Sequence, residues 1–181
     1  MLVFANCQTL DANEPIVLVP DDDWTETQVQ ILRNVAECWN MKYGTRLYVG
    51  RSDTTMQQVK FSFHDYTCLF GGGRTETNLP VRVSICRPSW YIPSDNAAYL
   101  NGVLATVLLH ELGHVLNIRK HASERGSVMA ASADEQDGQP EFSKNDDRLF
   151  FEANPDFRLT PSCQQVDVIG SSDGLECYCR D

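Results

Sequence analysis

Two histidines and a glutamate lie within five consecutive residues, His110-Glu111-Leu112-Gly113-His114. On an α-helix, residues four apart leave the same face one turn apart, so both imidazoles can hold one metal ion. The Glu111 side chain is rotated by about 100° from that of His110, which keeps its carboxylate off the metal but within reach of a water on it. Two neutral imidazoles on Zn²⁺, an acidified water and a carboxylate that takes its proton are what metal-assisted hydrolysis requires.

The segment around this motif is typical of a buried helix. The apolar run Val103–Leu109 leads into it without a proline or a glycine, and we expect the helix to begin at about Ala97. In the alternative interpretation, two histidines merely pack in the core. That arrangement would require a separate buried partner for each imidazole, and it would bury Glu111 without a reason. We therefore interpret the motif as a metal site.

Length and charge narrow the classes of function. A chain of 181 residues is large enough for one domain with a core of its own, with room for two subdomains. Its formal net charge is −10 and its 15 Lys and Arg residues form no cluster. This balance argues against nucleic acid and against an anionic membrane as partners. No apolar run approaches membrane-spanning length, and we expect a monomer.

The seven cysteines indicate disulfide bonds, with one cysteine left over. None is part of a Cys-x-x-Cys pair, so neither a cysteine-built zinc site nor a thioredoxin-like redox motif is expected. Disulfides point to a secreted or extracytoplasmic protein. Residues 1–6 are too short for the apolar core of a signal peptide. Either a leader is missing from this sequence, which we favour, or the protein is cytosolic and its thiols are reduced.

Four segments before the motif have the composition of strands, and the last two alternate apolar with polar residues. His64, at the end of the third, shares a face with Ser62, so we expect it at the surface or beside the site rather than on the metal. The glycine-rich run 71–74 is expected to be a flexible loop. The four segments are 15–20, 46–49, 59–64 and 81–86.

One long helix is expected between the first two of these strands. Thr25 and Gln28 form a capping box at its start, and Gly44 stops it. Its apolar positions recur on one stripe that includes Trp39, so this face should pack into the core. A strand, a helix, further strands and then the helix of the motif make an α+β order.

After the motif the chain is less regular. Residues 126–131 are expected to form a tight apolar turn and residues 134–138 a polar loop. Ser143 begins a last helix, and Pro155 ends it. The tail from Leu159 to Asp181 carries three cysteines and shows no convincing periodicity, so we expect disulfides rather than packing to hold it in place.

Together these features resemble the metzincin zinc endopeptidases, and within them the matrixins. The shared parts are the zinc helix, a third histidine just after it at His121, a methionine-containing turn at Ser127-Val128-Met129 and a last helix opened by Phe142-Ser143-Lys144-Asn145-Asp146. The resemblance implies a substrate cleft with the zinc at its bottom, between a larger upper and a smaller lower subdomain.

The fold implied by the resemblance is α+β. The upper subdomain would have a mixed β-sheet and two long helices, and the small C-terminal subdomain would hold the methionine turn and the last helix. The whole chain, 1–181, would be a single catalytic domain. Its parts would be the upper subdomain at about 13–117, the lower subdomain at 118–158 and a cysteine-containing tail at 159–181.

The third metal ligand departs from the family pattern. Metzincins usually read His-Glu-x-x-His-x-x-Gly-x-x-His, whereas here the glycine place holds Asn117 and the last place holds Lys120. We expect His121, one residue later, to be the ligand, with Asn117 in the left-handed conformation that glycine would otherwise adopt. The extra residue would form a small bulge that leaves Arg119 and Lys120 in water.

The residues after the turn depart as well. Met129 itself would lie beneath the histidines as an apolar floor. Astacin-like members carry a tyrosine that reaches the metal where this chain has Ala131, so the matrixins are the nearer analogue. Ala130 and Ala131 also replace the residues that shape the wall of the primary specificity pocket in matrixins.

The resemblance implies a secreted zinc endopeptidase that cuts protein or peptide substrates. His110, His114 and His121 would hold Zn²⁺ and leave the fourth position to water. Glu111 would act as general base toward that water and then as general acid toward the leaving amine. An extended substrate would pair with an edge strand, for which Val81–Cys86 is the candidate. Ca²⁺ is a second candidate cofactor without assigned ligands.

Two alternatives stay open. A thermolysin-like zinc hydrolase would take its third ligand from a glutamate, and Glu135 lies at a nearly suitable spacing, although in a loop rather than on a helix. A non-catalytic binding module would keep a structural zinc. Structural sites are closed by four protein ligands, and the fourth would have to come from His64 or a free cysteine. Glu111 favours catalysis, since a structural zinc has no use for it.

Overall fold

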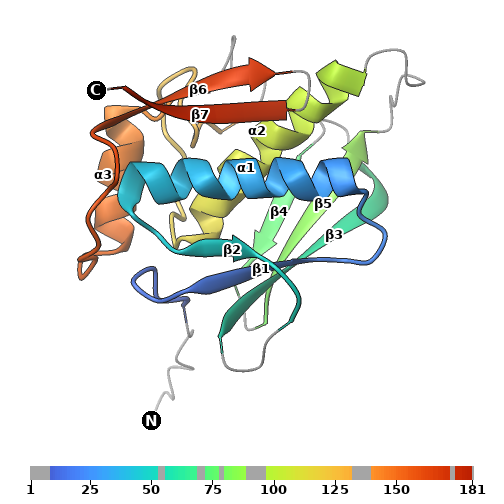
Figure 1. The fold of residues 1–181 in the computed structure, drawn as a ribbon, viewed down its shortest axis with the longest axis horizontal. Helices are drawn as coiled ribbons and strands as arrows, with labels where there is room; N and C mark the ends of the chain where they lie inside the picture. The colour runs from blue at the N-terminus through green and yellow to red at the C-terminus, as the bar shows by residue number, and fades with distance from the viewer. Residues whose placement is uncertain are drawn as a thin grey trace.

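A computed structural model of the chain describes residues 9–52, 56–68, 72–77, 80–88, 97–131, 140–171 and 174–180, without the side chains at 64–68, 87–88 and 97–99. Within these residues the fold consists of three helices and two sheets (Figure 1). In chain order the elements are β1 (Ile16–Pro20), α1 (Glu26–Tyr43), β2 (Leu47–Val49), β3 (Gln57–Cys68), β4 (Gly73–Glu76), β5 (Val81–Pro88), α2 (Ala97–Val115), α3 (Lys144–Ala153), β6 (Gln165–Ser171) and β7 (Gly174–Arg180).

The larger sheet has five strands in the order β2-β1-β3-β5-β4. β1 pairs in parallel with β2 and with β3, and β3 pairs in parallel with β5. β4 runs antiparallel to β5. Helix α1 joins the parallel strands β1 and β2, which need a crossover connection. The four predicted strands are confirmed, and the fold is a mixed, mostly parallel sheet packed with helices.

Helix α1 begins and ends where its sequence signals predict. The Thr25 hydroxyl accepts from the backbone N–H of Gln28, and the Gln28 side chain accepts from the backbone N–H of Thr25. Gly44 follows the helix with a φ of 77°. A Cβ on this residue would collide with the backbone oxygen of Thr160. Glycine is therefore required there both for its conformation and for space.

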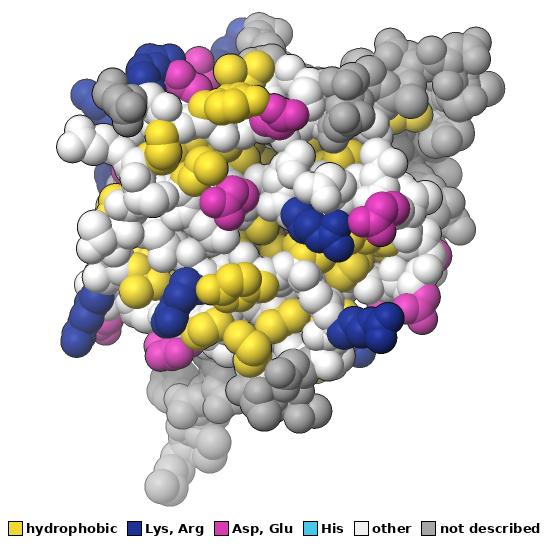
Figure 2. Space-filling model, in the orientation of Figure 1, with side chains coloured by type: hydrophobic (Ala, Val, Ile, Leu, Met, Phe, Trp, Pro, Cys, Tyr) yellow, Lys and Arg dark blue, Asp and Glu magenta, His cyan; other side chains and the backbone are white. Residues whose placement is uncertain are grey.

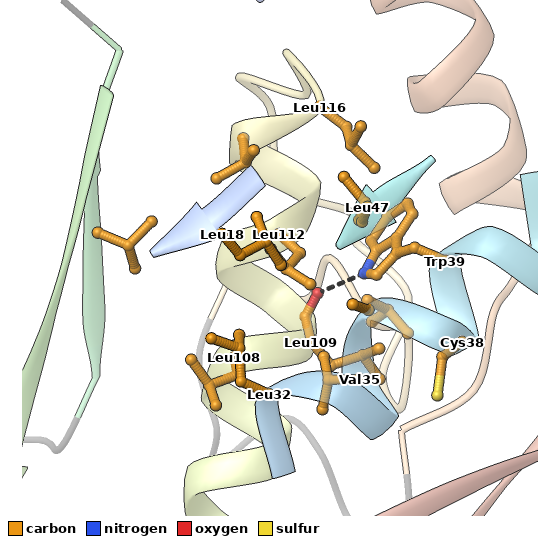
Figure 3. Close-up of a cluster of buried hydrophobic side chains, with 14 of the residues drawn as sticks. Leu18, Leu32, Val35, Cys38, Trp39, Leu47, Leu108, Leu109, Leu112 and Leu116 are labelled. Atoms are coloured by element: carbon orange, nitrogen blue, oxygen red, sulfur yellow. Dashed lines mark hydrogen bonds between the residues drawn. The ribbon is translucent and has the colours of Figure 1, made fainter. Parts of the chain in front are cut away.

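The core that positions the motif helix lies between α1, α2 and the sheet. Trp39 of α1 is fully buried and donates its indole N–H to the carbonyl of Leu109 in α2 over 3.0 Å (Figure 3). Each leucine buried around this bond stabilises the fold by about 1.5–3 kcal/mol. The cluster thus fixes α2 against α1 one residue before His110. Its leucines include Leu18, Leu32, Leu47, Leu108, Leu112 and Leu116.

The edge strand of the sheet differs from the predicted one. Val81–Cys86, expected at the edge, lies inside the sheet as part of β5, between β3 and β4. In the described residues the two edge strands are β2 and β4. β4, next to β5, includes Gly73 and Arg74 from the run predicted to be a loop, while Gly71 lies outside the described residues. Glycine has a low strand propensity, so the local sequence does not indicate a strand here. The segment is a strand because it pairs with β5.

The C-terminal tail is a packed hairpin, so the prediction that only disulfides hold it is wrong. β6 and β7 pair antiparallel and lie across α1 and α2 (Figure 1). Val166 and Val168 alternate on one face of β6 and are buried, and so is Leu175 at the start of β7. The hairpin therefore extends the core over the outer side of the two helices.

Disulfides attach this hairpin to the rest of the chain, as the cysteine content predicts. Cys38 of α1 is bonded to Cys177 of β7, and Cys163, just before β6, is bonded to Cys179. Cys86 is disulfide-bonded as well, so at least five of the seven cysteines are paired. The extracytoplasmic location inferred from them stays a prediction.

The surface over α1 carries charges of both signs. Figure 2 shows Lys and Arg side chains interspersed with Asp and Glu on this face, without one continuous basic patch. The exclusion of nucleic acid as a partner stays a prediction. Among the described helices, none is long and apolar enough to cross a bilayer.

We predict that the Cys38–Cys177 bond stabilises the fold more than the Cys163–Cys179 bond, because it closes a longer loop in the unfolded chain. The sequence separations are 139 and 16 residues, for which loop entropy gives about 5 and about 3 kcal/mol. Urea unfolding of the Cys38→Ala/Cys177→Ala and Cys163→Ala/Cys179→Ala proteins measures both losses. A greater loss of stability on removal of the Cys163–Cys179 bond would show that loop entropy does not determine which disulfide stabilises the fold more.

Candidate metal centre

Three histidines from α2 and the loop after it meet at one point. His110 and His114 lie one turn apart on α2, and one ring nitrogen of each lies within 4.8 Å of one on His121. The Nε2 atoms of His110 and His114 are 3.1 Å apart. A tetrahedral Zn²⁺ with Zn–N bonds of about 2.0–2.1 Å holds its ligand nitrogens about 3.3 Å apart. The two helical histidines thus have nearly the spacing of zinc ligands.

Hydrogen bonds determine which nitrogen of each helical histidine is free. Nδ1 of His110 lies 2.9 Å from the carbonyl oxygen of Val128, and Nδ1 of His114 lies 2.5 Å from that of Ile118. Because a carbonyl only accepts, both Nδ1 atoms carry the proton and both Nε2 atoms present a lone pair. Two facing lone pairs repel each other unless a cation lies between them. The donor set therefore fits a metal ion, and neutral imidazoles suit Zn²⁺.

The surroundings keep these imidazoles neutral, as metal ligands must be. Burial, together with the neighbouring His114, lowers the pKa of His110 to about 4. Burial also lowers the pKa of His114. The pKa of His121 is lowered by its partial burial and by His114. At neutral pH, protons therefore compete weakly with a metal for the three rings.

The chain leaves α2 through a turn that depends on Asn117. This residue has a φ of 69°, and it is the non-glycine residue with a positive φ in the described part of the chain. The N–H of Asn117 donates to the carbonyl of His114, and that of Ile118 donates to the carbonyl of Gly113. These two bonds make a Schellman ending. The prediction that Asn117 replaces the glycine is confirmed, and residues 119–120 are exposed as expected.

The Asn117 side chain also makes bonds that glycine could not. Its amide donates to the carbonyl of Leu10 over 2.8 Å and to Oδ1 of Asn154 over 3.0 Å. Asn154 in turn donates to the carbonyls of Leu116 and Phe150. The end of α2 is thereby joined both to the N-terminal segment and to the end of α3.

The methionine turn packs against the motif helix at Gly113. Met129 is fully buried, and a Cβ on Gly113 would collide with its sulfur and lie 3.3 Å from the Trp39 ring. The backbone N–H of Ala122 donates to the carbonyl of Met129 over 2.7 Å, which fastens the chain immediately after His121. Met129 thus lies against the motif helix at Gly113, one residue before His114. That it forms an apolar floor beneath the histidines stays a prediction.

A buried carboxylate holds the methionine turn in place. Asp146, at the start of α3, is fully buried. Its Oδ1 accepts from the Ser127 hydroxyl over 2.6 Å and from the backbone N–H of Met129 over 3.0 Å. Its Oδ2 accepts from the backbone N–H of Ser143, which completes the capping box of α3. The predicted helix start is confirmed, and the same carboxylate also serves the turn, which the sequence does not indicate.

Glu111 lies beside the histidines and beneath the edge strand. It is only 3% exposed, and its Oε2 accepts from the Thr75 hydroxyl over 2.5 Å. A Cβ on Gly73 would lie 2.6 Å from Glu111 Cδ, so the backbone of β4 passes directly over the carboxylate. Burial raises the pKa of Glu111, and the bond from Thr75 acts against this rise. Neither Thr75 nor Gly73 belongs to a recognisable motif, so sequence analysis misses both.

Some predicted positions lie outside the described part of the structure. Glu135 and the polar loop 134–138 are not described. The backbone of His64 lies in β3 opposite Cys86, but its side chain is not described either. In the described residues, the group of side chains that could hold a metal consists of the three histidines His110, His114 and His121. Their role as ligands stays a prediction.

We predict that Asn117→Ala destabilises the protein more than Asn117→Gly. Both variants lose the two side-chain hydrogen bonds, but the left-handed conformation costs alanine a further 1–2 kcal/mol, approximately, and costs glycine little. Urea unfolding of the metal-free proteins measures the difference. Equal stabilities would contradict the requirement for a left-handed residue at this position.

We predict that Asp146→Asn lowers the free energy of unfolding by about 1–3 kcal/mol, because an amide cannot accept at both oxygens. Zinc affinity should fall by about tenfold or more, since Val128, which orients His110, belongs to the turn that Asp146 holds. The matched control is Asp147→Asn, which removes the negative charge that faces Lys42 and Tyr43 and should leave zinc affinity unchanged. Parental zinc affinity in Asp146→Asn would contradict the prediction.

Comparison with known proteins supports the fold and leaves the activity to be inferred from the site. No protein-family model matches the chain, and no curated protein matches it. Among solved structures it is similar to the archaemetzincin of Methanopyrus kandleri, with a TM-score of 0.51 and 16% sequence identity. The match covers 84% of this chain and 98% of that chain. At this identity the similarity shows the fold alone: this chain shares the fold of an archaemetzincin.

Proposed function

We propose that this protein is a zinc-dependent endopeptidase whose metal is held by His110, His114 and His121. The observation that supports this most is the pair of neutral imidazoles whose Nε2 lone pairs face each other at 3.1 Å, with His121 beside them. A zinc ion held by these three histidines would polarise a scissile carbonyl and would lower the pKa of water. The fold shared with archaemetzincin is consistent with this proposal.

In this proposal Glu111 is the catalytic acid and base. It takes a proton from the attacking water and delivers it to the amine that leaves when the peptide bond breaks. Burial raises its pKa, which brings a carboxyl group closer to the range in which it can both accept and donate a proton near neutrality. In this proposal His110 and His114 of α2 hold the metal, so the same helix sets the position of the Glu111 carboxylate relative to the metal.

The peptide substrate is proposed to bind along β4. This strand is one of the two edge strands of the described sheet and is the one that passes over Glu111, so an extended peptide added to it would lie beside the three histidines. Backbone hydrogen bonds to an edge strand bind peptides with little regard to sequence. β4 therefore takes the role that sequence analysis gave to Val81–Cys86.

The alternatives have less support. A structural zinc site would need a fourth protein ligand, and in the described residues the candidate group holds three histidines. A buried carboxylate beside such a site would also have no function. The thermolysin-like alternative requires Glu135 as third ligand, whereas His121 already lies beside the helical pair.

The finer features inferred from the sequence belong to the same proposal. A matrixin-like site, without the tyrosine ligand of astacin-like members, follows from Ala131. Secretion is supported by the five disulfide-bonded cysteines. We further propose a monomer with zinc as its cofactor. Calcium gains no support from the described residues, whose candidate metal group consists of imidazoles rather than oxygen ligands.

We predict that the zinc-loaded protein cleaves an unfolded protein substrate, that a zinc chelator abolishes cleavage and that Glu111→Ala lowers the rate by about 100- to 10,000-fold. This variant should bind zinc as the parent does, because it keeps all three histidines. The exposed Glu124→Ala is the matched control and should cleave normally. Cleavage that persists in Glu111→Ala, or in the presence of chelator, would contradict the proposal.

A further inference from the structure

Thr75 connects the edge strand of the sheet to the carboxylate of Glu111. Its hydroxyl lies 2.5 Å from Oε2 of Glu111 and 3.4 Å from the backbone carbonyl of the same residue. A hydroxyl has one proton to donate, and the shorter contact, to Oε2 of the Glu111 side chain, takes it. The bond occupies one carboxylate oxygen and leaves Oε1 for proton transfer.

The backbone of Thr75 faces the free edge of the sheet. The N–H of Cys86 donates to the carbonyl of Gly72 over 2.9 Å, so these two residues form a hydrogen-bonded pair across β4 and β5. In an antiparallel ladder such pairs alternate with pairs whose backbone groups point away from the partner strand. Gly73 and Thr75, opposite Ile85 and Val83, are of the second kind. Among the residues that the structure describes, no strand pairs with β4 on this side, so the N–H and C=O groups of Gly73 and Thr75 are available to a further strand.

The side chains of β4 alternate in the same register. Arg74 and Glu76 are exposed, whereas Gly73 and Thr75 are half-buried and face Glu111. Gly73 leaves room for the Glu111 side chain, which a Cβ would displace. The two positions that present backbone to the free edge are thus the two that contact the catalytic carboxylate.

We propose that Thr75 is a positioning residue that couples substrate binding to the catalytic base. A peptide that pairs with the free edge of β4 fixes the backbone of residue 75. The hydroxyl of Thr75 then holds the Glu111 carboxylate with Oε1 directed to the attacking water. This inference rests on the proposed peptidase function and extends it to one residue outside the motif.

Kinetics of two Thr75 variants test the proposal. Thr75→Val keeps the shape and the strand propensity but removes the hydroxyl, and its kcat on an unstructured peptide should fall by about 10- to 100-fold with little change in KM. Thr75→Ser keeps the hydroxyl and should retain most of the parental kcat. The control is Thr45→Val, which removes the buried hydroxyl bond to Asn40, and which should lower Tm but leave kcat unchanged.

A second measurement does not depend on activity. Thermal unfolding of the metal-free parent, Thr75→Val, Glu111→Ala and the double variant forms a double-mutant cycle. If the hydroxyl bonds the carboxylate, the Tm shifts of the two single variants should not add, because each removes the same bond. Zinc affinity of Thr75→Val should equal that of the parent, since all three histidines remain.

The outcomes separate the inference from the function it rests on. An active parent with an unimpaired Thr75→Val, equal losses of kcat in the valine and serine variants, or a change confined to KM would overturn the positioning role alone. Additive Tm shifts would also overturn it. A parent that cleaves no peptide would overturn the proposed function and the positioning role together, and the Tm cycle would then still establish whether the bond exists.

Discussion

The hydrogen bonds from two imidazole rings to backbone carbonyls determine what this site can be. Val128 and Ile118 accept from Nδ1 of His110 and His114, so both Nε2 lone pairs must point into the same small space. Without a cation that arrangement is repulsive, and with one it is favourable. The two carbonyls belong to the methionine turn and to the turn after α2. The local folds of both turns therefore decide whether the metal site exists.

The rest of the structure keeps these two carbonyls in place. The turn after α2 requires a left-handed residue, and Asn117 meets this need while its side chain binds Leu10 and Asn154. The methionine turn is held by Asp146 from the start of α3. Packing of Met129 and Trp39 against Gly113 sets the distance between the methionine turn and the motif helix. Core packing, capping and metal binding thus depend on the same few residues.

Local signals in the sequence predict much of this arrangement. The capping box at Thr25, the helix start at Ser143, the helix of the motif and the left-handed Asn117 all follow from interactions within a few residues, and all are confirmed. Elements formed by distant pairing are different. β4 begins in a glycine-rich run and is a strand because β5 pairs with it. The C-terminal hairpin has short apolar faces whose partners are on α1 and α2. Thr75 and Glu111 are 36 residues apart in sequence, and they are in contact only because β4 crosses above α2.

Zinc affinity measured by competition with a chromophoric chelator tests the central claim most directly, in the parent and in His121→Ala, Lys120→Ala and Glu135→Ala. Loss of a residue that only hydrogen-bonds to a metal ligand typically weakens metal binding by roughly 10- to 100-fold. If three imidazoles hold the metal, His121→Ala removes a ligand itself and should weaken zinc binding by more than that. Lys120→Ala and Glu135→Ala should bind zinc as the parent does. Parental affinity in His121→Ala, together with a large loss in Glu135→Ala, would contradict the account and favour a glutamate as the third ligand.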